Sequence, residues 1–339
     1  MDPLKTQSYD FELPQDRIAT KPANPKDSSK LLVYDRKTNL VTHTTFKNIL
    51  YFIPKDTSIV LNDTKVIKAR LFGKKSSGGK IELLINKPFT NNEIECYIRG
   101  KVKIGTTLIF DNNLSANVIF TDSSGIRRVQ FFYNQELIGF DKVIEIIESI
   151  GHIPLPPYMN REDNKDDEKN YQTIFAKNKG AVAAPTASLH FTTELFDKMT
   201  KEFNHNYITL HVGAGTFKPV ESEDILNHPM HTESYYIPTK TQKLLDSNKP
   251  ILAIGTTVTR TIEYYIRKQE LQGEANLFLH PNNKPLRVNY LLTNFHLPKS
   301  TLLMLVASFV GIEKTKELYD EAIKNNYRFY SYGDAMLII

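Results

Sequence analysis

Cysteine is almost absent from this chain of 339 residues, in which Cys96 is the only one. A single cysteine excludes an internal disulfide framework and is typical of a protein in a reducing compartment. Neither a Cys-x-x-Cys nor a His-Glu-x-x-His pattern occurs. The sequence therefore offers no support for a zinc site, and we expect no metal.

Long hydrophobic runs are also missing. The most apolar stretch, residues 302–310, is far shorter than the roughly 20 residues that span a bilayer, and it predicts a buried helix or strand. The first residues, Met-Asp-Pro-Leu-Lys-Thr-Gln, lack the apolar core of a signal peptide. We therefore expect a cytoplasmic protein that is not associated with a membrane.

Three motifs with well-defined chemistry are absent as well. The chain has no Gly-x-x-x-x-Gly-Lys phosphate loop, no Gly-x-Gly-x-x-Gly dinucleotide fingerprint and no Gly-x-Ser-x-Gly nucleophile elbow. Gly213-Ala-Gly215 comes nearest to the fingerprint but lacks the third glycine. The sequence thus gives no support to a phosphate-loop enzyme, a dinucleotide-binding protein or a serine hydrolase.

Charge is present in ordinary amount but is unevenly placed. Residues 61–105 carry ten lysines or arginines against four acids, a net charge of +6, whereas the whole chain has +5. A basic segment on an otherwise neutral protein indicates a polyanionic partner such as RNA. The alternative is a solvated lysine-rich surface.

The pattern of the chain predicts an α/β fold with an inserted β-barrel. Short β-type runs separated by Gly, Asn and Asp turns fill residues 62–135, which indicates a small barrel or sandwich. Beyond residue 151 helices and strands alternate, as in an α/β layer domain, after a charged loop at 160–170 that we expect to be exposed and mobile. Residues 1–60 hold too few elements to stand alone. We therefore predict a discontinuous α/β domain, residues 1–60 and 151–339, with an antiparallel β-barrel domain inserted at 61–150.

Three loops combine a histidine with small or turn-forming residues. They are residues 180–193, 210–220 and 293–301, and their histidines are His190, His211 and His296. Small side chains let backbone amides approach a ligand closely, and histidine carries protons near neutral pH. Each loop alone could be a tight turn with a satisfied histidine. Together they favour the walls of one pocket.

Further polar residues extend this set. The run 251–257, followed by Arg260, predicts a strand, a glycine turn and a helix whose first amides favour an anion, such as a carboxylate near Thr256 or Thr257. Glu233 lies two residues after His231, so both share one face if they lie in a strand. Asp334 precedes the last predicted strand and is either catalytic or bonded to turn amides. Lys299 either binds an acidic group or helps to open a helix.

Long motifs in order along nearly the whole chain resemble one family, the S-adenosylmethionine:tRNA ribosyltransferase-isomerases of queuosine biosynthesis. The matching segments are Tyr-Asp-Phe-Glu-Leu-Pro at 9–14, residues 61–71, Gly-His-Ile-Pro-Leu-Pro-Pro-Tyr at 151–158, residues 171–176, 180–191, 209–217, 230–233, 255–257, 293–306 and 327–335. Two departures are Ser188, where the family usually has glycine, and Lys218, where glutamine is frequent.

The resemblance implies a reaction. The family transfers the ribosyl unit of S-adenosylmethionine to a 7-aminomethyl-7-deazaguanine (preQ1) at the tRNA wobble position. The products are epoxyqueuosine-tRNA, adenine and methionine. S-adenosylmethionine is thus a substrate, and neither a prosthetic group nor a metal is expected. The family fold, an α/β domain that carries a β-barrel domain, agrees with the pattern above, and we expect a monomer that binds tRNA.

Roles for particular residues follow as hypotheses. The catalytic candidates are His190, His211, His296, Asp334 and Glu233. The substrate-binding candidates are Gly180, Pro185, Thr186, Gly213, Gly215, Thr256, Thr257, Arg260 and Lys299. The candidates for contact with tRNA phosphates are Lys65, Lys68 and Arg70. Which group acts as base or acid at each step does not follow from the sequence.

Two other classes of protein remain as alternatives. A methyltransferase with the same cofactor would release S-adenosylhomocysteine, and it usually has a glycine-rich first loop and an acidic residue after its second strand, which we do not find in order. A non-catalytic RNA-binding protein would explain the basic segment but not three histidine-bearing loops far from it.

Overall fold

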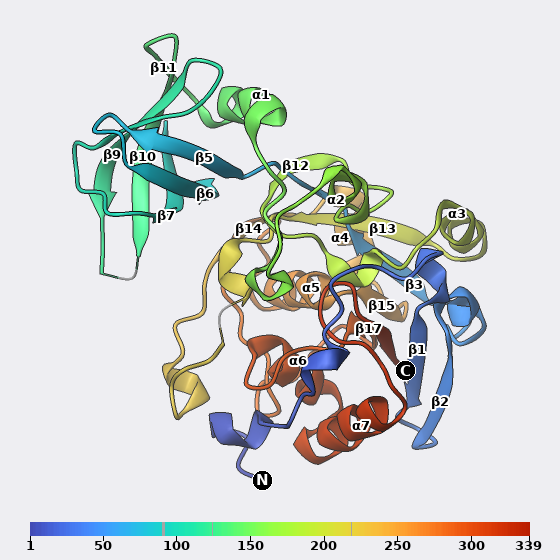
Figure 1. Ribbon diagram of the computed structural model, residues 1–339. Coiled ribbons are helices and arrows are strands. Elements are labelled where there is room, and N and C mark those ends of the chain that lie inside the picture. Colours follow the sequence, from blue (N-terminus) through green and yellow to red (C-terminus); the bar gives the residue numbers. More distant parts are fainter. Residues whose placement is uncertain (90–91, 124, 218) are drawn as a thin grey trace. The chain divides into compact units, whose positions relative to one another are not determined.

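The computed structural model describes residues 1–89, 92–123, 125–217 and 219–339; Lys218, one of the two departures noted above, lies outside them. The chain forms two compact units. The α/β unit comprises residues 1–64, 172–178 and 185–339, and the barrel unit comprises residues 65–171 and 179–184 (Figure 1). Residues 151–171, which the predicted boundaries place in the α/β domain, lie in the barrel unit.

The α/β unit is built on a mixed sheet of nine strands among the described residues. Side by side, they are β16 (Gln272–Ala275), β14 (Glu233–Tyr236), β13 (His205–Leu210), β3 (Ser58–Asn62), β15 (Ile251–Ile254), β17 (Tyr290–Asn294), β18 (Ala335–Ile338), β1 (Lys30–Asp35) and β2 (Leu40–Thr45). Strands β13, β3, β15 and β17 are mutually parallel. Every residue of β3 and β15 is buried, as expected for central strands that are covered on both faces.

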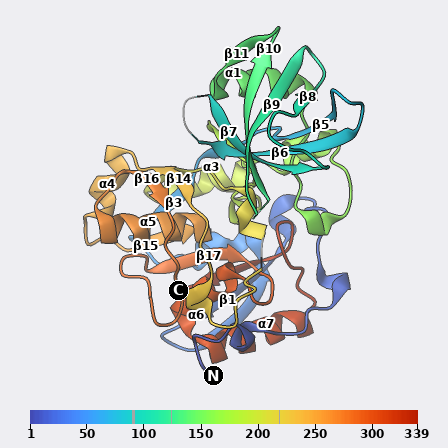
Figure 2. The same cartoon turned by 90° about the vertical axis from the view of Figure 1, so that its left-hand side faces the viewer.

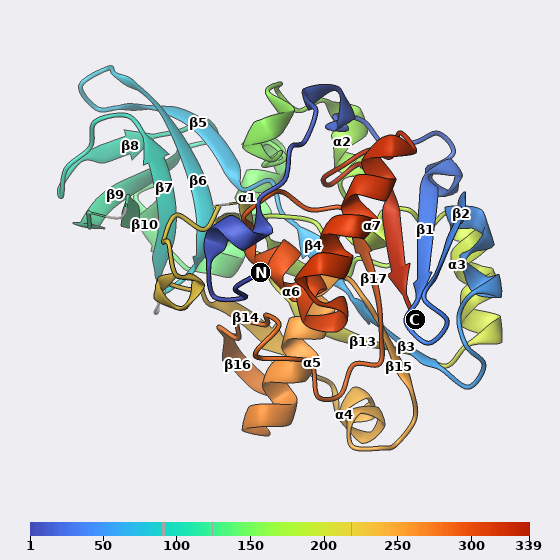
Figure 3. The same ribbon diagram turned by 90° about the horizontal axis from the view of Figure 1, so that it is seen from below.

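Helices cover both faces of this sheet. They are α3 (Thr193–Glu202), α4 (Thr239–Leu245), α5 (Thr256–Lys268), α6 (Thr301–Val310) and α7 (Ile312–Lys324) (Figure 3). Successive residues of β1 point to opposite faces. Leu32 and Tyr34 join a core with α6 and α7, whereas Leu31 and Val33 join a core with α3. Thr192 and Ser300 cap α3 and α6 through their side chains.

The barrel unit contains a closed antiparallel barrel. Its strands are β5 (Arg70–Lys75), β6 (Lys80–Pro88), β7 (Glu93–Arg99), β8 (Thr107–Ile109), β9 (Leu114–Thr121), β10 (Ile126–Tyr133) and the short β11 (Glu136–Ile138) (Figure 2). The ring closes because β10 pairs with β7 on one side and with β9 on the other. Alternate residues such as Leu71, Leu83 and Cys96 fill the interior. The predicted fold class, α/β with a small antiparallel β-barrel, is thereby confirmed.

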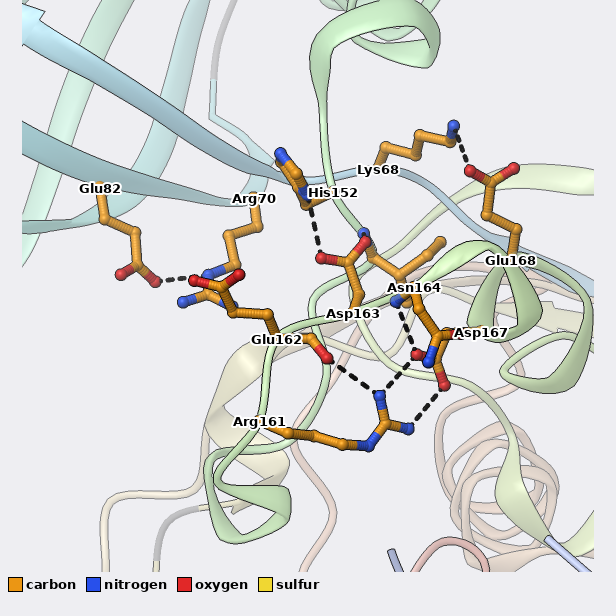
Figure 4. Close-up of polar contacts among 11 residues, drawn as sticks. Lys68, Arg70, Glu82, His152, Arg161, Glu162, Asp163, Asn164, Asp167 and Glu168 are labelled. Carbon is orange, nitrogen blue, oxygen red and sulfur yellow. Dashed lines mark hydrogen bonds and ion pairs between the residues drawn. The ribbon is translucent and has the colours of Figure 1, made fainter. Parts of the chain in front are cut away.

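Two helices follow the barrel strands, α1 (Phe140–Ile150) and α2 (Lys165–Asn170). The segment 160–170, predicted to be an exposed mobile loop, forms helix α2 over part of its length, although four of the six α2 residues are exposed as expected. Asn164 caps α2, its side chain accepting from the amide of Asp166, and Asp167 completes a capping box. Asp167 is buried and accepts two hydrogen bonds from Arg161, of 2.6 and 2.7 Å (Figure 4). Charged residues thus form a folded segment here because they satisfy one another.

The chain passes between the two units along β4 (Thr64–Val66) and β12 (Asn178–Ala181), which pair in a small sheet of their own. The sequence did not reveal these strands, because Asn178-Lys-Gly-Ala has no strand-like alternation. No helix within the described ranges is both long enough and apolar enough to cross a membrane.

Candidate active site

One edge of the mixed sheet gathers most of the predicted site residues. The parallel strands β3, β13, β15 and β17 all end there. Strand β18 runs antiparallel to β17, with Ala335 opposite Asn294, so it begins at the same edge. In open α/β sheets the carboxyl ends of parallel strands form the usual binding crevice. We call this edge, which is the candidate location for catalysis, the catalytic edge.

His211 follows directly after the last residue of β13, Leu210. Its Nδ1 lies 2.8 Å from the hydroxyl of Thr64, and its Nε2 forms no hydrogen bond with any described residue. Burial lowers the pKa of His211, and the nearby Asp63 carboxylate opposes that shift. The side chain is only partly buried. His211 therefore presents a neutral imidazole with one free nitrogen.

Polar side chains after β3 hold the end of β13 in place. Asn62 is fully buried; its side chain donates to the carbonyl of Leu210 over 2.9 Å and accepts from the Leu210 amide over 3.0 Å. Asp63 accepts from the hydroxyl of Thr209 over 2.6 Å. These contacts fix the direction in which the next residue, His211, leaves the strand.

His190 lies deeper and is more constrained. Its Nδ1 lies 2.8 Å from the Ser29 hydroxyl, its Nε2 accepts from the side-chain amide of Asn294 over 3.2 Å, and its ring stacks on Phe46. Burial, together with the positive charges of Arg328 and Lys26, lowers its pKa to about 3. Because both ring nitrogens are occupied, His190 is suited to positioning Asn294 rather than to transferring a proton.

His296 lies two residues beyond β17. Its Nε2 lies 2.7 Å from the hydroxyl of Thr293, and its amide donates to the Tyr319 hydroxyl over 3.1 Å. Burial lowers the pKa of His296 to about 3, so the ring is neutral at physiological pH. Its Nδ1 forms no hydrogen bond with any described residue, so this nitrogen has no protein partner.

Two buried oxygens near β17 lack a partner among the described residues: Ser188 Oγ and Asn294 Oδ1. Ser188 closes a short 3-10 helix, Thr186–Ser188, that lies against β17. Leaving a buried polar atom unpaired costs on the order of 1–3 kcal/mol. A ligand that donates hydrogen bonds here would recover that cost.

Glu233 and Arg260 form a buried ion pair at the catalytic edge. Glu233 begins β14, and its second oxygen accepts from the amide of Gly213 over 3.2 Å. His231 lies 3.7 Å from the same carboxylate and packs against Gly215, where an added Cβ would meet its ring at 3.0 Å. Glu233 thereby ties the 211–215 loop to helix α5. The positive charge of the Arg260 guanidinium is therefore already neutralised by the Glu233 carboxylate.

The first turn of α5 lies at the same edge. Gly255, at φ +100° and ψ 155°, joins β15 to α5 and offers no side chain to cap the helix. Thr256 and Thr257 open the helix and are almost fully buried. Uncapped amides at the positive end of a 13-residue helix are suited to bind a carboxylate.

A cavity of about 360 Å³ lies further along α5. Tyr264 and Arg267 line it, and they lie four and seven residues beyond Arg260, on the same helix face. Phe278 and His280 form another part of the lining, and His280 Nδ1 is buried without a partner among the described residues. This volume and lining suit an aromatic heterocycle.

Comparison with known proteins agrees with this arrangement over the whole chain. A model of the queuosine biosynthesis protein family matches residues 6–338. The chain belongs to this family. Family members named S-adenosylmethionine:tRNA ribosyltransferase-isomerase include one from Aliarcobacter butzleri, 63% identical over 339 residues with 100% of both chains covered. Another, from Sulfurimonas denitrificans, is 61% identical, with 99% of this chain and 98% of the relative covered.

A crystal structure in the family shows the same fold. The S-adenosylmethionine tRNA ribosyltransferase from Thermotoga maritima is 34% identical, with a TM-score of 0.55, and the match covers 98% of this chain and 100% of the other. The resemblance that the motifs indicate is therefore confirmed.

Several predicted site residues lie elsewhere or are engaged by the protein itself. Gly180 lies in β12, in the barrel unit, whereas Pro185 and Thr186 lie in the α/β unit. Asp334 accepts from the amides of Lys30 and Arg328, over 2.9 and 2.7 Å, which matches the turn-bonding alternative. Lys299 forms a 2.8 Å ion pair with Asp10, and it lowers the pKa of that carboxyl.

The predicted RNA-contacting cations lie in the barrel unit, and two of the three are paired with acids. Lys68 lies 2.8 Å from Glu168, and Arg70 lies 2.7 Å from Glu82 (Figure 4). Lys65 is half-buried. Most of the positive charge of this group is therefore already neutralised within the protein.

Sequence reasoning missed four polar residues at the catalytic edge: Asn62, Asp63, Thr64 and Asn294. The available signal was their position, because each ends a buried strand or follows one within two residues. No group of three or more His, Cys, Asp or Glu side chains that could hold a metal occurs in the part of the chain that the structure describes.

Proposed function

We propose that this chain transfers the ribosyl unit of S-adenosylmethionine to 7-aminomethyl-7-deazaguanine at the wobble position of tRNA. It isomerises that unit to give epoxyqueuosine-tRNA and releases adenine and methionine. The observation that carries this proposal is the 63% identity to a ribosyltransferase-isomerase over all 339 residues. The proposal includes a cytoplasmic, monomeric enzyme with an α/β catalytic domain and an inserted barrel domain.

The chemistry needs a base before it needs an acid. The sulfonium of S-adenosylmethionine acidifies the adjacent ribose C–H, so a neutral imidazole can remove that proton. His211 suits this role because it is neutral, partly accessible and has a free Nε2. The imidazolium formed there can then protonate adenine as adenine departs, which returns His211 to its neutral state.

The other polar groups hold the substrate and the loops in place. The methionine carboxylate would accept from the uncapped amides at Thr256 and Thr257. Ser188 Oγ and Asn294 Oδ1 would accept hydrogen bonds from the methionine ammonium or the ribose hydroxyls. Glu233 and Arg260, already paired, would keep Gly213 and Gly215 against the nucleoside. Fixed orientation of this kind contributes on the order of 7–11 kcal/mol to such a reaction.

The cavity beside α5 supports a place for the adenine ring. Phe278 and Tyr264 would contact the purine faces, and the unpartnered His280 Nδ1 would meet a ring nitrogen or the amino group. His296, neutral and with a free Nδ1, is the second candidate for proton transfer.

Incubation with S-adenosylmethionine and tRNA that carries preQ1, followed by mass spectrometry of nucleosides and small molecules, tests the proposal. We expect epoxyqueuosine with equal amounts of adenine and methionine. A methylated nucleoside with S-adenosylhomocysteine would identify a methyltransferase instead. Tight tRNA binding without turnover would identify a non-catalytic RNA-binding protein.

A further inference from the structure

The outer surface of β5, β6 and β7 combines cations with aromatic rings. Its residues, which we call the β5–β7 face, are Phe72, Lys74, Lys80, Tyr97 and Arg99. They alternate along their strands with inward-pointing, mostly apolar residues, so all five point away from the barrel interior. Antiparallel pairing places the strands side by side in the order β5, β6, β7.

The strand register brings like charges together on this face. Lys74 lies directly opposite Lys80, whereas Arg99 lies opposite the acidic Glu82, two residues further along β6. Like charges opposite each other on adjacent strands destabilise the pairing. An anion bound between the two lysines would remove that repulsion.

These cations differ from the ones that the sequence singled out. Lys68 and Arg70 are paired with Glu168 and Glu82 (Figure 4). Within the described residues, no ion pair involves Lys74, Lys80 or Arg99, and all three are exposed. The connection that follows β7 adds two more exposed lysines, Lys101 and Lys103. The positive charges of the barrel unit that have no ion-pair partner among the described residues therefore include Lys74, Lys80 and Arg99 on the β5–β7 face.

An ordered aromatic ring lies beside the cations. Phe72 is 43% exposed. The guanidinium of Arg70 lies 4.9 Å from its centroid, and the ring of His152 meets it edge-on at 5.0 Å. His152 is itself held by Asp163, at 2.9 Å (Figure 4). A large apolar ring kept partly in solvent by charged neighbours is suited to stack on a nucleobase.

We propose that the β5–β7 face binds a single-stranded stretch of the tRNA substrate. Phosphates lie at Lys74, Lys80 and Arg99, and an unpaired base stacks on Phe72. Proteins that bind single strands combine these two elements, a cationic track and an aromatic platform. The inference rests on the proposed function for the identity of the RNA, but binding to the face does not require turnover.

Two variants test the face by equilibrium binding of full-length tRNA to the intact chain over a range of salt concentrations. Phe72→Ala should raise Kd about 5-fold to 150-fold, the usual effect of removing one stacking partner. Lys74→Ala/Lys80→Ala should raise Kd and lower the slope of log K against log salt by roughly 1.4, about 0.7 per lost phosphate contact. Phe72→Tyr should bind like the wild type, since the ring is retained.

Matched controls test whether an effect on binding is specific to the β5–β7 face or would follow from the loss of any exposed positive charge or apolar side chain. Lys240→Ala/Lys243→Ala removes two exposed lysines from α4, and Leu137→Ala trims a side chain that is 46% exposed on β11. Both should leave Kd and the salt slope unchanged. Unchanged binding by the Phe72 and Lys74/Lys80 variants, with wild-type thermal unfolding, would overturn the proposal.

Turnover distinguishes the two proposals. At saturating tRNA the face variants should keep wild-type kcat, because none of the substituted residues belongs to the catalytic edge. A wild-type chain that binds tRNA through this face yet releases no adenine would refute the proposed function and leave the face intact.

Discussion

At the residue scale, the three predicted histidines have different environments. His211 has a free nitrogen, His296 is buried with one nitrogen bonded, and His190 has both nitrogens bonded. The loops that carry them look alike in sequence. What separates them is the partner that each ring meets across the fold, Thr64, Thr293 or Ser29, and no local pattern shows that.

The first prediction concerns the assignment of the base. His211→Ala should lower kcat about 10²- to 10⁴-fold, because a general base contributes that much, with little change in the thermal midpoint. Release of adenine under single-turnover conditions measures this. Thr64→Ala is the companion variant, and we expect a smaller loss because the ring remains but is less fixed. A His211→Ala enzyme with wild-type kcat would remove His211 from the mechanism.

The second prediction concerns acid stability. In the folded chain the pKa of His190 and that of His296 lie near 3, below the ordinary 6.5. Between those values the unfolded chain binds more protons, so stability falls as pH drops below about 6.5 and is constant above it, as far as these two groups are concerned. Each contributes at most about 1.4 kcal/mol per pH unit.

Urea unfolding at pH 7 and pH 5 measures this effect. His296→Gln should be less stable at pH 7 but should lose less stability between the two pH values than the wild type does. His205→Gln, at the opposite end of β13, controls for the loss of an imidazole. An equal loss in wild type and His296→Gln would contradict the assignment.

The third prediction distinguishes two roles for Ser188. If its unpartnered hydroxyl awaits substrate, Ser188→Ala should raise KM for S-adenosylmethionine several-fold while the thermal midpoint stays level or rises, since an unpaired buried hydroxyl is lost. An unchanged KM would show that the hydroxyl of Ser188 only occupies space.

At the scale of elements, the junction between β15 and α5 depends on the backbone conformation of one glycine. Gly255 has φ +100° and ψ 155°, a conformation that is essentially restricted to glycine. An added Cβ would meet Ala187 only at an ordinary 3.7 Å, so backbone strain rather than a clash sets the cost.

The fourth prediction follows from that junction. Gly255→Ala should lower the free energy of unfolding by about 1–3 kcal/mol and raise KM for S-adenosylmethionine, because the first amides of α5 would turn away from the carboxylate. Denaturant unfolding and steady-state kinetics measure the two effects. Gly105→Ala, also at positive φ but in the barrel unit, should destabilise without changing KM.

Strands and helices with a strong apolar pattern were predictable at this scale. The strand, glycine turn and helix predicted from residues 251–260 form β15, Gly255 and α5, and the apolar run 302–310 forms α6, because burial in these segments follows the local pattern. Strands β14 and β16 were not predicted, since Glu-Ser-Tyr-Tyr and Gln-Gly-Glu-Ala owe their strand form to tertiary pairing with neighbours. The helix within the charged segment 160–170 was missed for a similar reason, because the side chain of Arg161 stabilises α2 through its contact with Asp167.

At the scale of the whole molecule, the sequence predicted the fold class, and the assignment of the chemistry to the α/β half stays a prediction. Parallel strands that end in polar residues predict a common edge once the strand order is known, but the order itself depends on pairings between distant segments. The basic segment was correctly placed on the barrel unit. Its pairing with acids such as Glu82 and Glu168 depends on the fold, so Lys68 and Arg70 were indistinguishable from the exposed Lys74 and Lys80.

The fifth prediction uses the single thiol. Cys96 lies in the barrel wall with no exposed surface, and burial raises its pKa well above the ordinary value. It should therefore resist thiol reagents in the native enzyme and react only when the barrel opens. Following labelling and far-ultraviolet circular dichroism together through a urea titration shows whether the two units unfold at one midpoint or at two.

The order of strands also has a consequence for synthesis on the ribosome. All barrel strands lie between residues 70 and 138, so this barrel can close while most of the chain is still unmade. The central sheet cannot, because β18, the last strand, lies between β17 and β1 and joins them. Strand β1 must therefore wait until residues 335–338 have been made. A chain terminated before Ala335 would have a finished barrel and a central sheet in two pieces.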